Sequence, residues 1–173
     1  PSHSTSRGRP TFTDNNAAYP SGILAVDSNG ALYGTCEGTQ TFVYPGSVYQ
    51  LVPPAVTGAP WTYNKLYNFS LQGTDGLSPI GGVIFGLNGA LYGTTAAGGV
   101  TGNGAVFELA PPSAPGGTWT ETILYNFTGG SDGAFPAQGL VINKVGTLFG
   151  IAEYGGAQTS YCQGCGTTYA LKP

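Results

Sequence analysis

The chain has little charge, no methionine and a single histidine. Only 8% of its 173 residues are charged, with a net charge of −3, whereas about 25% are charged in an average soluble domain. The sequence has no basic stripe, which argues against nucleic-acid binding, and no apolar run long enough for a transmembrane helix. The only histidine, His3, lies in a polar arm, and this disfavours a Ser-His-Asp triad.

Glycine, proline and aromatic residues are abundant instead. The chain has 30 Gly, 13 Pro, 11 Tyr, 8 Phe and 2 Trp. The aromatic residues supply apolar area for a core, and frequent Gly and Pro are typical of turns between many short strands. A surface with much Thr, Ser and Asn but little Lys or Glu favours an extracellular or cell-surface protein. Because the chain starts at Pro1 and lacks Met, we expect any secretion signal to have been removed.

One seven-residue phrase occurs three times. Asn29–Thr35 reads NGALYGT, Asn88–Thr94 repeats it, and Val145–Ile151 carries an altered copy, VGTLFGI. A period of about 58 residues indicates one supersecondary unit built three times, with each copy packed on its neighbours. The repeat therefore predicts the fold class before any chemistry is considered.

Each repeat predicts four antiparallel strands. In the second copy, Asn88-Gly89 is a strong hairpin signal between two apolar runs. Ala105–Ala110 alternates apolar and polar residues until Pro111 ends the pattern. Four such strands, repeated, predict the antiparallel blade of an all-β, propeller-like fold. We expect strands at 22–27, 31–36, 47–52 and 61–69 in the first copy, and at 82–87, 90–95, 105–110 and 119–127 in the second.

The third repeat lacks a fourth strand. Its strands are expected at 139–144, 147–152 and 167–172, and the sequence ends there. A matching segment lies at the other end of the chain, where Thr11-Phe12-Thr13 resembles Asn68-Phe69-Ser70 and Asn126-Phe127-Thr128. We therefore predict an assembly strand made of Pro10, Thr11, Phe12 and Thr13. Its predicted acceptor edge consists of Thr167, Thr168, Tyr169, Ala170 and Leu171.

This pattern divides the chain into a polar arm, 1–9, and a single repeat domain, 10–173. The domain contains the loose fourth strand, 10–19, and repeats at 20–78, 79–136 and 137–173. Propellers usually have four to eight blades, so three blades would have to splay widely to close a ring. The chain could close a small ring alone, two or more chains could share a larger ring, or the loose strand could complete the last blade of a neighbour. The sequence leaves these possibilities open. Donation to a neighbour would make an open head-to-tail contact, which gives a filament if the rotation does not close.

The repeated words LYGT, GGxxGxGxVFxL, WTxxxLYNF and GxDGxxP occur in order. They resemble those of the secreted bacterial choice-of-anchor tandem-repeat proteins of the GloVer type, over roughly residues 10 to 173. The resemblance implies extracellular, surface-attached, propeller-like repeats. It implies no established catalytic activity. This sequence departs from the family in having three copies and no recognisable anchor, which leaves open whether it is a processed subunit or a fragment.

The three cysteines are Cys36, Cys162 and Cys165. The CxxC spacing of the last two is found in redox pairs and zinc sites. A redox pair needs a helix N-terminus, and zinc needs four ligands; neither is apparent here. We favour a Cys162–Cys165 disulfide that holds a loop, with Cys36 buried, and the alternative is a bridge from Cys36 to one of the pair.

The remaining polar candidates have structural explanations. Asn68 and Asn126 begin N-x-S/T sequons and are candidate glycosylation sites, although Asn is also common in turns. Asp75 and Asp132 each precede a Gly between blades, where a turn is favoured over a catalytic acid pair. Asp27 begins a DSNG turn that lacks the later acidic ligand of a calcium loop. Glu108 and Glu121 lie on strands where a solvated face is expected.

Aromatic residues recur in register, and we expect them to pack between blades rather than stack on sugars. The residues concerned are Trp61, Trp119, Tyr33, Tyr92 and Phe149. We therefore expect an extracellular structural subunit that assembles with copies of itself through its N-terminal strand. The alternative is a secreted carbohydrate-binding module closed in cis. We expect no enzyme activity, cofactor or metal, no nucleic-acid partner and no membrane span, with covalent or bound glycans left open.

Overall fold

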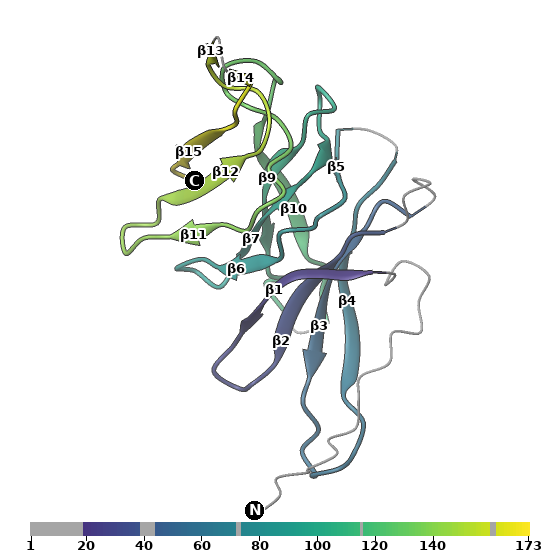
Figure 1. Ribbon diagram of the computed structural model, residues 1–173. Coiled ribbons are helices and arrows are strands. Elements are labelled where there is room, and N and C mark those ends of the chain that lie inside the picture. Colours follow the sequence, from purple (N-terminus) through teal and green to yellow (C-terminus); the bar gives the residue numbers. More distant parts are fainter. Residues whose placement is uncertain (1–18, 39–43, 72–73, 115, 160–161) are drawn as a thin grey trace, which may run out of the picture.

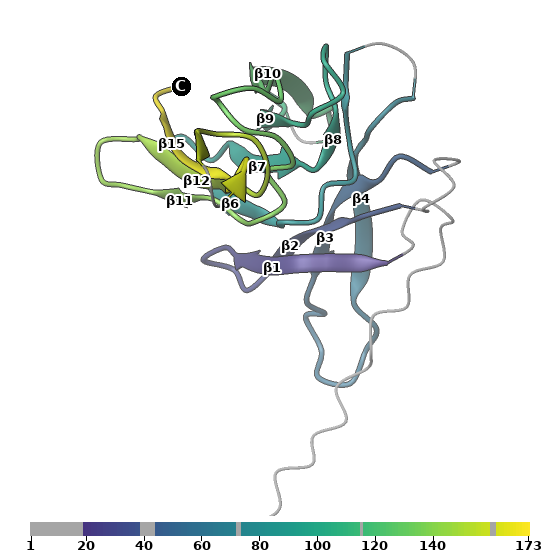
Figure 2. The same cartoon turned by 45° about the horizontal axis from the view of Figure 1, so that its top comes forward.

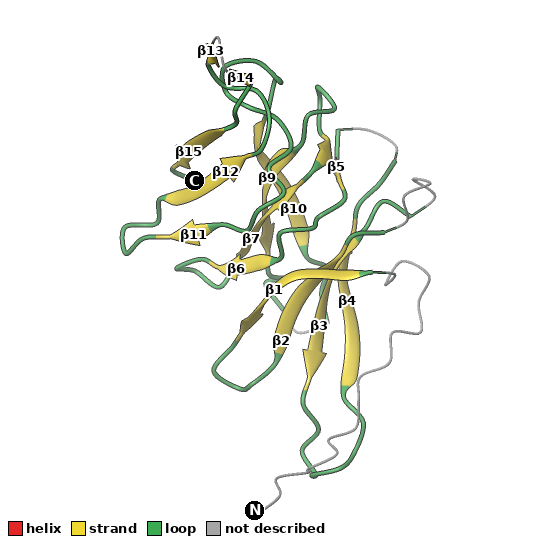
Figure 3. Cartoon of the chain, in the orientation of Figure 1, coloured by secondary structure: helices red, strands yellow, loops and turns green. Residues whose placement is uncertain are grey.

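The fold is all-β in the part of the chain described by the computed structural model, residues 19–38, 44–71, 74–114, 116–159 and 162–173. Three antiparallel sheets follow one another along the sequence (Figures 1 and 3), and we name them blades 1, 2 and 3. The expected propeller-like architecture of antiparallel blades is confirmed. Each strand predicted within the repeats is present, with its ends shifted by a few residues.

The blades share one strand order. Blade 1 consists of β1 (Pro20–Val26), β2 (Leu32–Cys36), β3 (Ser47–Val52) and β4 (Thr62–Asn68). Blade 2 consists of β6 (Val83–Phe85), β7 (Leu91–Thr95), β9 (Ala105–Ala110) and β10 (Thr120–Asn126). Blade 3 consists of β11 (Val141–Ile142), β12 (Leu148–Ala152) and β15 (Thr167–Leu171). Two short ribbons pair β5 (Gly76–Leu77) with β8 (Ala97–Gly98), and β13 (Gln158–Thr159) with β14 (Cys162–Gln163).

The first hairpin of each blade is closed by a side-chain oxygen that accepts backbone N–H groups. Asp27 Oδ1 accepts from Asn29 N and Ala31 N, both at 2.9 Å. In blade 3, Asn143 Oδ1 accepts from Val145 N and Thr147 N at 3.1 and 2.9 Å. The Asp27 carboxylate thus has a turn-forming role, as its sequence context predicts.

A glycine on the second strand of each blade lies beneath an aromatic ring from the third strand. Cross-strand partners are Gly34 with Tyr49, Gly93 with Phe107, and Gly150 with Tyr169. A Cβ added to Gly93 would lie 2.5 Å from Phe107 Cζ, and one added to Gly150 would lie 2.3 Å from Tyr169 Oη. The glycine of this repeated motif therefore leaves space for the aromatic ring of the third strand, so that the sheet packs without a gap.

The core lies between blades. One buried cluster joins blade 1, through Tyr33, Val48 and Phe69, to blade 2, through Phe107 and Leu109. A second cluster joins the other face of blade 2 to blade 3. It contains Tyr92, Val106, Phe127, Leu140 and Leu148. Blade 2 uses alternate residues of its strands for its two neighbours, as the period of two requires.

The expected packing between blades holds for three of the five aromatic residues, and Trp61 and Phe149 are exceptions. Tyr33, Tyr92 and Trp119 all belong to the two interblade clusters or pack against them. Trp61 packs on a third cluster, Cys36, Tyr49 and Leu51, within blade 1. Phe149 is instead 40% exposed, because it lies on the face of blade 3 that points away from blade 2.

The inner strands of adjacent blades approach backbone to backbone through glycine. Ile23 and Gly82 form a parallel bridge, and a Cβ added to Gly22 would lie 2.3 Å from Gly82 N. A Cβ added to Gly139 would lie 2.9 Å from Gly81 O. The strands β1, β6 and β11 accordingly lie one above another in Figure 1, and in Figure 2 β6 and β11 both lie above β1.

The chain enters every blade through the same backbone geometry. Tyr19, Ser78 and Phe135 have φ of 59°, 56° and 57°, and each precedes a proline. Their carbonyls accept hydrogen bonds from the N–H groups of Glu37, Ala96 and Glu153, at 3.0, 3.0 and 3.2 Å. A positive φ is uncommon for these residue types, so its presence at one repeat position indicates a required turn.

Candidate functional site

The outer edge of β15 is the point at which blade 3 differs from blades 1 and 2. The corresponding third strands, β3 and β9, are paired on both sides, with β4 and β10 on their outer edges. β15 pairs with β12 through five registered positions. Its other edge carries no strand among the described residues. Blade 3 therefore has three strands in the described part of the chain.

A groove of about 340 Å³ lies along this edge. One wall is the whole of β15, which includes all five predicted acceptor-edge residues, Thr167, Thr168, Tyr169, Ala170 and Leu171. The opposite wall comes from the end of blade 2 and the turn that follows it. Its residues are Tyr125, Phe127, Ser131 and Asp132.

The matching position between blades 1 and 2 is filled by β10. There Ile123 and the adjacent Trp119 pack on the cluster that contains Phe69, against which Tyr67 also packs. Tyr67 and Phe69 face blade 2 from the same repeat positions from which Tyr125 and Phe127 face blade 3. The groove therefore has the walls of a fourth-strand position but lacks a strand in the described part of the chain.

The groove wall on blade 2 is built in the same way as its counterpart on blade 1. The rings of Phe127 and Tyr169 are 5.0 Å apart at 64°, and those of Phe69 and Phe107 are 5.2 Å apart at 70°. Tyr125 Oη donates to Asp132 Oδ2, just as Tyr67 Oη donates to Asp75 Oδ2, both at 3.0 Å. This repetition shows that the two walls have the same construction.

Both aspartates hold interblade turns, as expected. Asp132 Oδ2 accepts from Thr128 N at 2.8 Å, and Asp75 Oδ2 accepts from Ser70 N at 2.9 Å. Hydrogen bonds from Thr128 and Tyr125 lower the pKa of the Asp132 carboxyl, since they stabilise its charged form. The two carboxylates serve separate turns rather than one acid pair.

Tyr169 is the middle residue of β15 and lines the groove. Burial raises the pKa of its hydroxyl, and this buried Oη has no hydrogen-bond partner within the described residues. A buried hydroxyl left without a partner costs about 1 to 3 kcal/mol. The groove is therefore lined by aromatic rings from both walls, while the Tyr169 hydroxyl is buried over Gly150 of β12.

Glu121 corrects one expectation. Its strand position suggested a solvated carboxyl, but Glu121 faces blade 1 and is half buried, and its Oε1 has no hydrogen-bond partner in the described structure. Burial, and next the nearby Asp75 carboxylate, raise the pKa of Glu121 to about 7. Tyr67, on the opposite blade, also lies close enough to interact with this carboxyl.

Glu121→Gln should remove a pH-dependent cost to stability. The raised pKa means that the folded state holds the proton more tightly, so stability falls as pH rises from 4.5 to about 7 and stays lower above that range. Because Glu121 is only half buried, we expect the variant to gain about 1 to 2 kcal/mol at pH 8 and little at pH 4. Urea unfolding at both pH values measures this difference.

Glu108→Gln is the control, since Glu108 pairs opposite Thr122 rather than Glu121. An equal gain at pH 4 and pH 8 would contradict the prediction.

Other predicted residues lie apart from the groove or outside the described residues. The assembly strand, Pro10 to Thr13, lies outside them, as does the side chain of Cys162, so the Cys162–Cys165 disulfide remains a prediction. Cys36 is fully buried, as expected. Asn68 is exposed at the end of β4, whereas Asn126 Oδ1 accepts from Val100 N at 2.9 Å. Glycosylation at both sites remains a prediction.

The groove wall that blade 2 contributes is not predicted from the sequence. The signal was present in the repeated Tyr-Asn-Phe word at Tyr67 and Tyr125, but no spacing rule shows that it faces the next blade. Within the described ranges, no group of three or more His, Cys, Asp or Glu residues could hold a metal ion. No helix in the same ranges is long and apolar enough to cross a membrane.

Comparison with known proteins agrees with the repeated architecture. A search of curated proteins finds no match. The family model described as the Gloeobacter/Verrucomicrobia repeat matches residues 1–173, the whole of the chain. The chain belongs to the Gloeobacter/Verrucomicrobia repeat family.

Proposed function

We propose that the chain is an extracellular structural subunit that assembles with copies of itself by strand complementation. The observation that carries the proposal is the groove along β15, which has the walls of a fourth-strand position. In this proposal Pro10 to Thr13 of another copy pair along β15. An uncovered strand edge is otherwise an aggregation hazard, and pairing with a strand from another chain is an established mode of association.

The blade-entry turns favour donation between chains over closure within one chain. Ser78 N donates to Pro45 O and Phe135 N donates to Asn103 O, at 2.9 and 3.0 Å, and both acceptors lie on the preceding blade. Tyr19 has the same φ, so the residues that precede it should form part of a preceding blade that packs on blade 1. Among the described residues, blade 3 shares a core cluster with blade 2 and none with blade 1. The preceding blade is therefore assigned to a second copy.

The proposal has no catalytic step, since the groove requires only backbone pairing and apolar contact. The low charge of the chain and its many Thr, Ser and Asn residues support an extracellular or cell-surface location. The Cys162–Cys165 disulfide fits such an oxidising compartment. Non-reducing and reducing mass spectrometry would measure the disulfide directly.

Deleting residues 1–16 should abolish assembly and leave a folded chain. The reason is that the deletion removes the proposed donor strand but no residue of the three described blades. Negative-stain electron microscopy and light scattering would show long particles for the full chain and small uniform ones for the truncated chain. A synthetic peptide of residues 1–16 should bind the truncated chain in a one-to-one complex, and a scrambled peptide should not.

Two outcomes would count against the proposal. If the truncated chain assembles as the full chain does, strand donation is wrong. If the full chain is a monodisperse monomer, the strand closes its own chain, and a screen for glycan binding becomes the next experiment.

A further inference from the structure

Each end of the blade array presents an apolar sheet face that blade 2 buries in the same position. Blade 2 packs one face on blade 1 and the other on blade 3. Blades 1 and 3 each bury only their inner face in this way. The strand registers relate the residues of the two exposed faces to buried residues of blade 2, position by position.

The outer face of blade 3 is defined by Val141, Phe149 and Ile151, which are 64%, 40% and 48% exposed. A shallow hollow of about 560 Å³ lies over this face. The equivalent residues of blade 2 are Ile84, Tyr92 and Thr94. Tyr92 and Thr94 are buried, and Ile84 packs on the cluster shared with blade 3.

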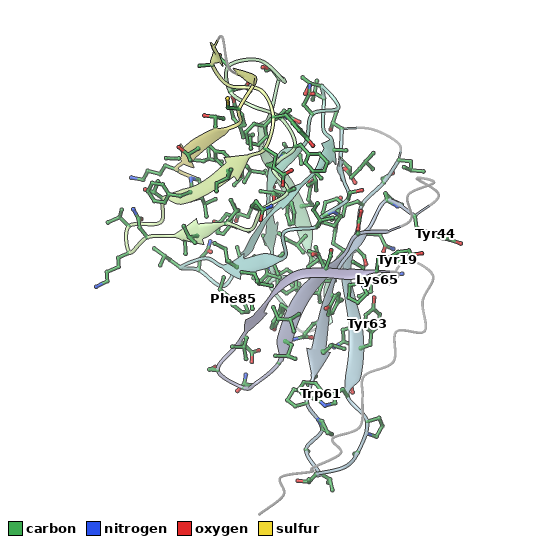
Figure 4. All side chains as sticks on the ribbon, viewed as in Figure 1. Tyr19, Tyr44, Trp61, Tyr63, Lys65 and Phe85 are labelled. Atoms are coloured by element: carbon green, nitrogen blue, oxygen red, sulfur yellow. The ribbon has the colours of Figure 1, made fainter. Side chains whose placement is uncertain are left out.

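The outer face of blade 1 is defined by Leu24, Val26, Leu32, Trp61 and Tyr63. Leu24 and Val26 are 50% and 60% exposed. Leu32, Trp61 and Tyr63 are partly buried against a cluster contained within blade 1. Figure 4 shows Trp61, Tyr63 and Lys65 along β4, with Tyr19 near the start of β1.

The same positions on blade 2 form its contact with blade 1. Val83, Phe85, Leu91 and Trp119 correspond to Leu24, Val26, Leu32 and Trp61. Val83 and Leu91 are buried in the cluster shared with blade 1, and Phe85 and Trp119 pack against it. The outer face of blade 1 thus has the composition of a surface that receives a preceding blade.

We infer that the outer face of blade 3 docks on the outer face of blade 1 of a second copy, so that the packing between blades 1, 2 and 3 continues across the joint. The inference rests on the proposed function and names a second surface for the same partner. The contact is heterologous, because it joins two different surfaces, and it propagates unless its rotation closes a ring. Continuity with the two interfaces inside the chain identifies a second copy as the occupant.

One backbone contact can be specified across this joint. Pro45 and Asn103 accept the blade-entry N–H groups of Ser78 and Phe135. Each lies two residues before the third strand of its blade, next to a positive-φ glycine. Cys165 occupies this position before β15, followed by Gly166 at φ 80°. The Cys165 carbonyl should therefore accept from Tyr19 N of the second copy.

Ile151→Arg tests the face without touching the groove, since Ile151 lines the hollow on the outer face and not the groove along β15. Its side chain is half exposed, so the variant should fold with an unchanged melting temperature. Burying an unpaired guanidinium in an apolar interface is unfavourable. We expect the critical concentration for assembly, measured by light scattering, to rise about tenfold or more. Binding of the peptide of residues 1–16 to the truncated form of this variant should remain unchanged.

Leu87→Arg is the matched control, because Leu87 is 72% exposed in a hairpin turn of blade 2 and belongs to neither outer face. This variant should assemble at the wild-type concentration. If Ile151→Arg also assembles there while the peptide still binds, face docking is wrong and strand complementation stands. If the peptide fails to bind the truncated wild-type chain, the proposed function itself fails.

Discussion

Phe127→Ala should lower the free energy of unfolding by about 3 to 5 kcal/mol. The Phe127 side chain is fully buried between blades 2 and 3, and its ring meets Tyr125 and Tyr169 at centroid distances of 5.1 and 5.0 Å. Alanine would keep the backbone bond from Phe127 N to Gly104 O but would leave a cavity where the ring was. Urea unfolding of the purified variant measures the loss.

The same substitution should also weaken assembly, because Phe127 forms part of the groove wall. Leu87→Ala provides the control, since the Leu87 side chain is 72% exposed and should change stability by less than about 0.5 kcal/mol. A loss below about 1 kcal/mol for Phe127→Ala would show that blades 2 and 3 do not depend on this ring. Peptide binding by the truncated variant would then separate an effect on the groove from an effect on folding.

Gly82→Ala should cost about 2 to 5 kcal/mol. Gly82 has a φ of 81°, a conformation that costs an L-residue about 1 to 2 kcal/mol. The added Cβ would also lie 2.3 Å from Ile23 O, and relieving such overpacking typically costs about 1 to 3 kcal/mol more. Since Ile23 belongs to blade 1, the substitution would force apart the inner strands of two adjacent blades.

Gly89→Ala separates these two contributions. Gly89 has nearly the same φ, 82°, but a Cβ there would meet no atom within 4 Å. This control should therefore show only the conformational cost of about 1 to 2 kcal/mol. Equal losses for the two variants in urea unfolding would show that the close approach of Gly82 to Ile23 adds nothing to stability.

The sequence predicts the blades well because their signals are local. Asn88-Gly89 closes a hairpin, and alternation along Ala105–Ala110 identifies a strand whose two faces are both used. The recurrence of these signals then gives the remaining strands by position. Counting within the repeat also predicts three strands for blade 3, the number found in its described part.

Other features depend on which blade faces which residue, and local patterns carry no such information. Glu121 is half buried because β10 turns it toward blade 1 and toward Asp75 in the turn between blades 1 and 2. Phe149 is exposed because no described blade covers the outer face of blade 3. The groove combines β15 with residues from the end of blade 2, and only the packing of two blades brings those walls together.

The shared entry turn has a consequence for how such chains can change in length. Tyr19-Pro20, Ser78-Pro79 and Phe135-Pro136 admit the chain to a blade in one way, whatever the number of blades before it. Duplicating or losing one whole unit in the gene would therefore alter the length of a subunit without altering either of its ends. In the proposed assembly, subunits with different numbers of blades would remain interchangeable, and one filament could incorporate chains of unequal length.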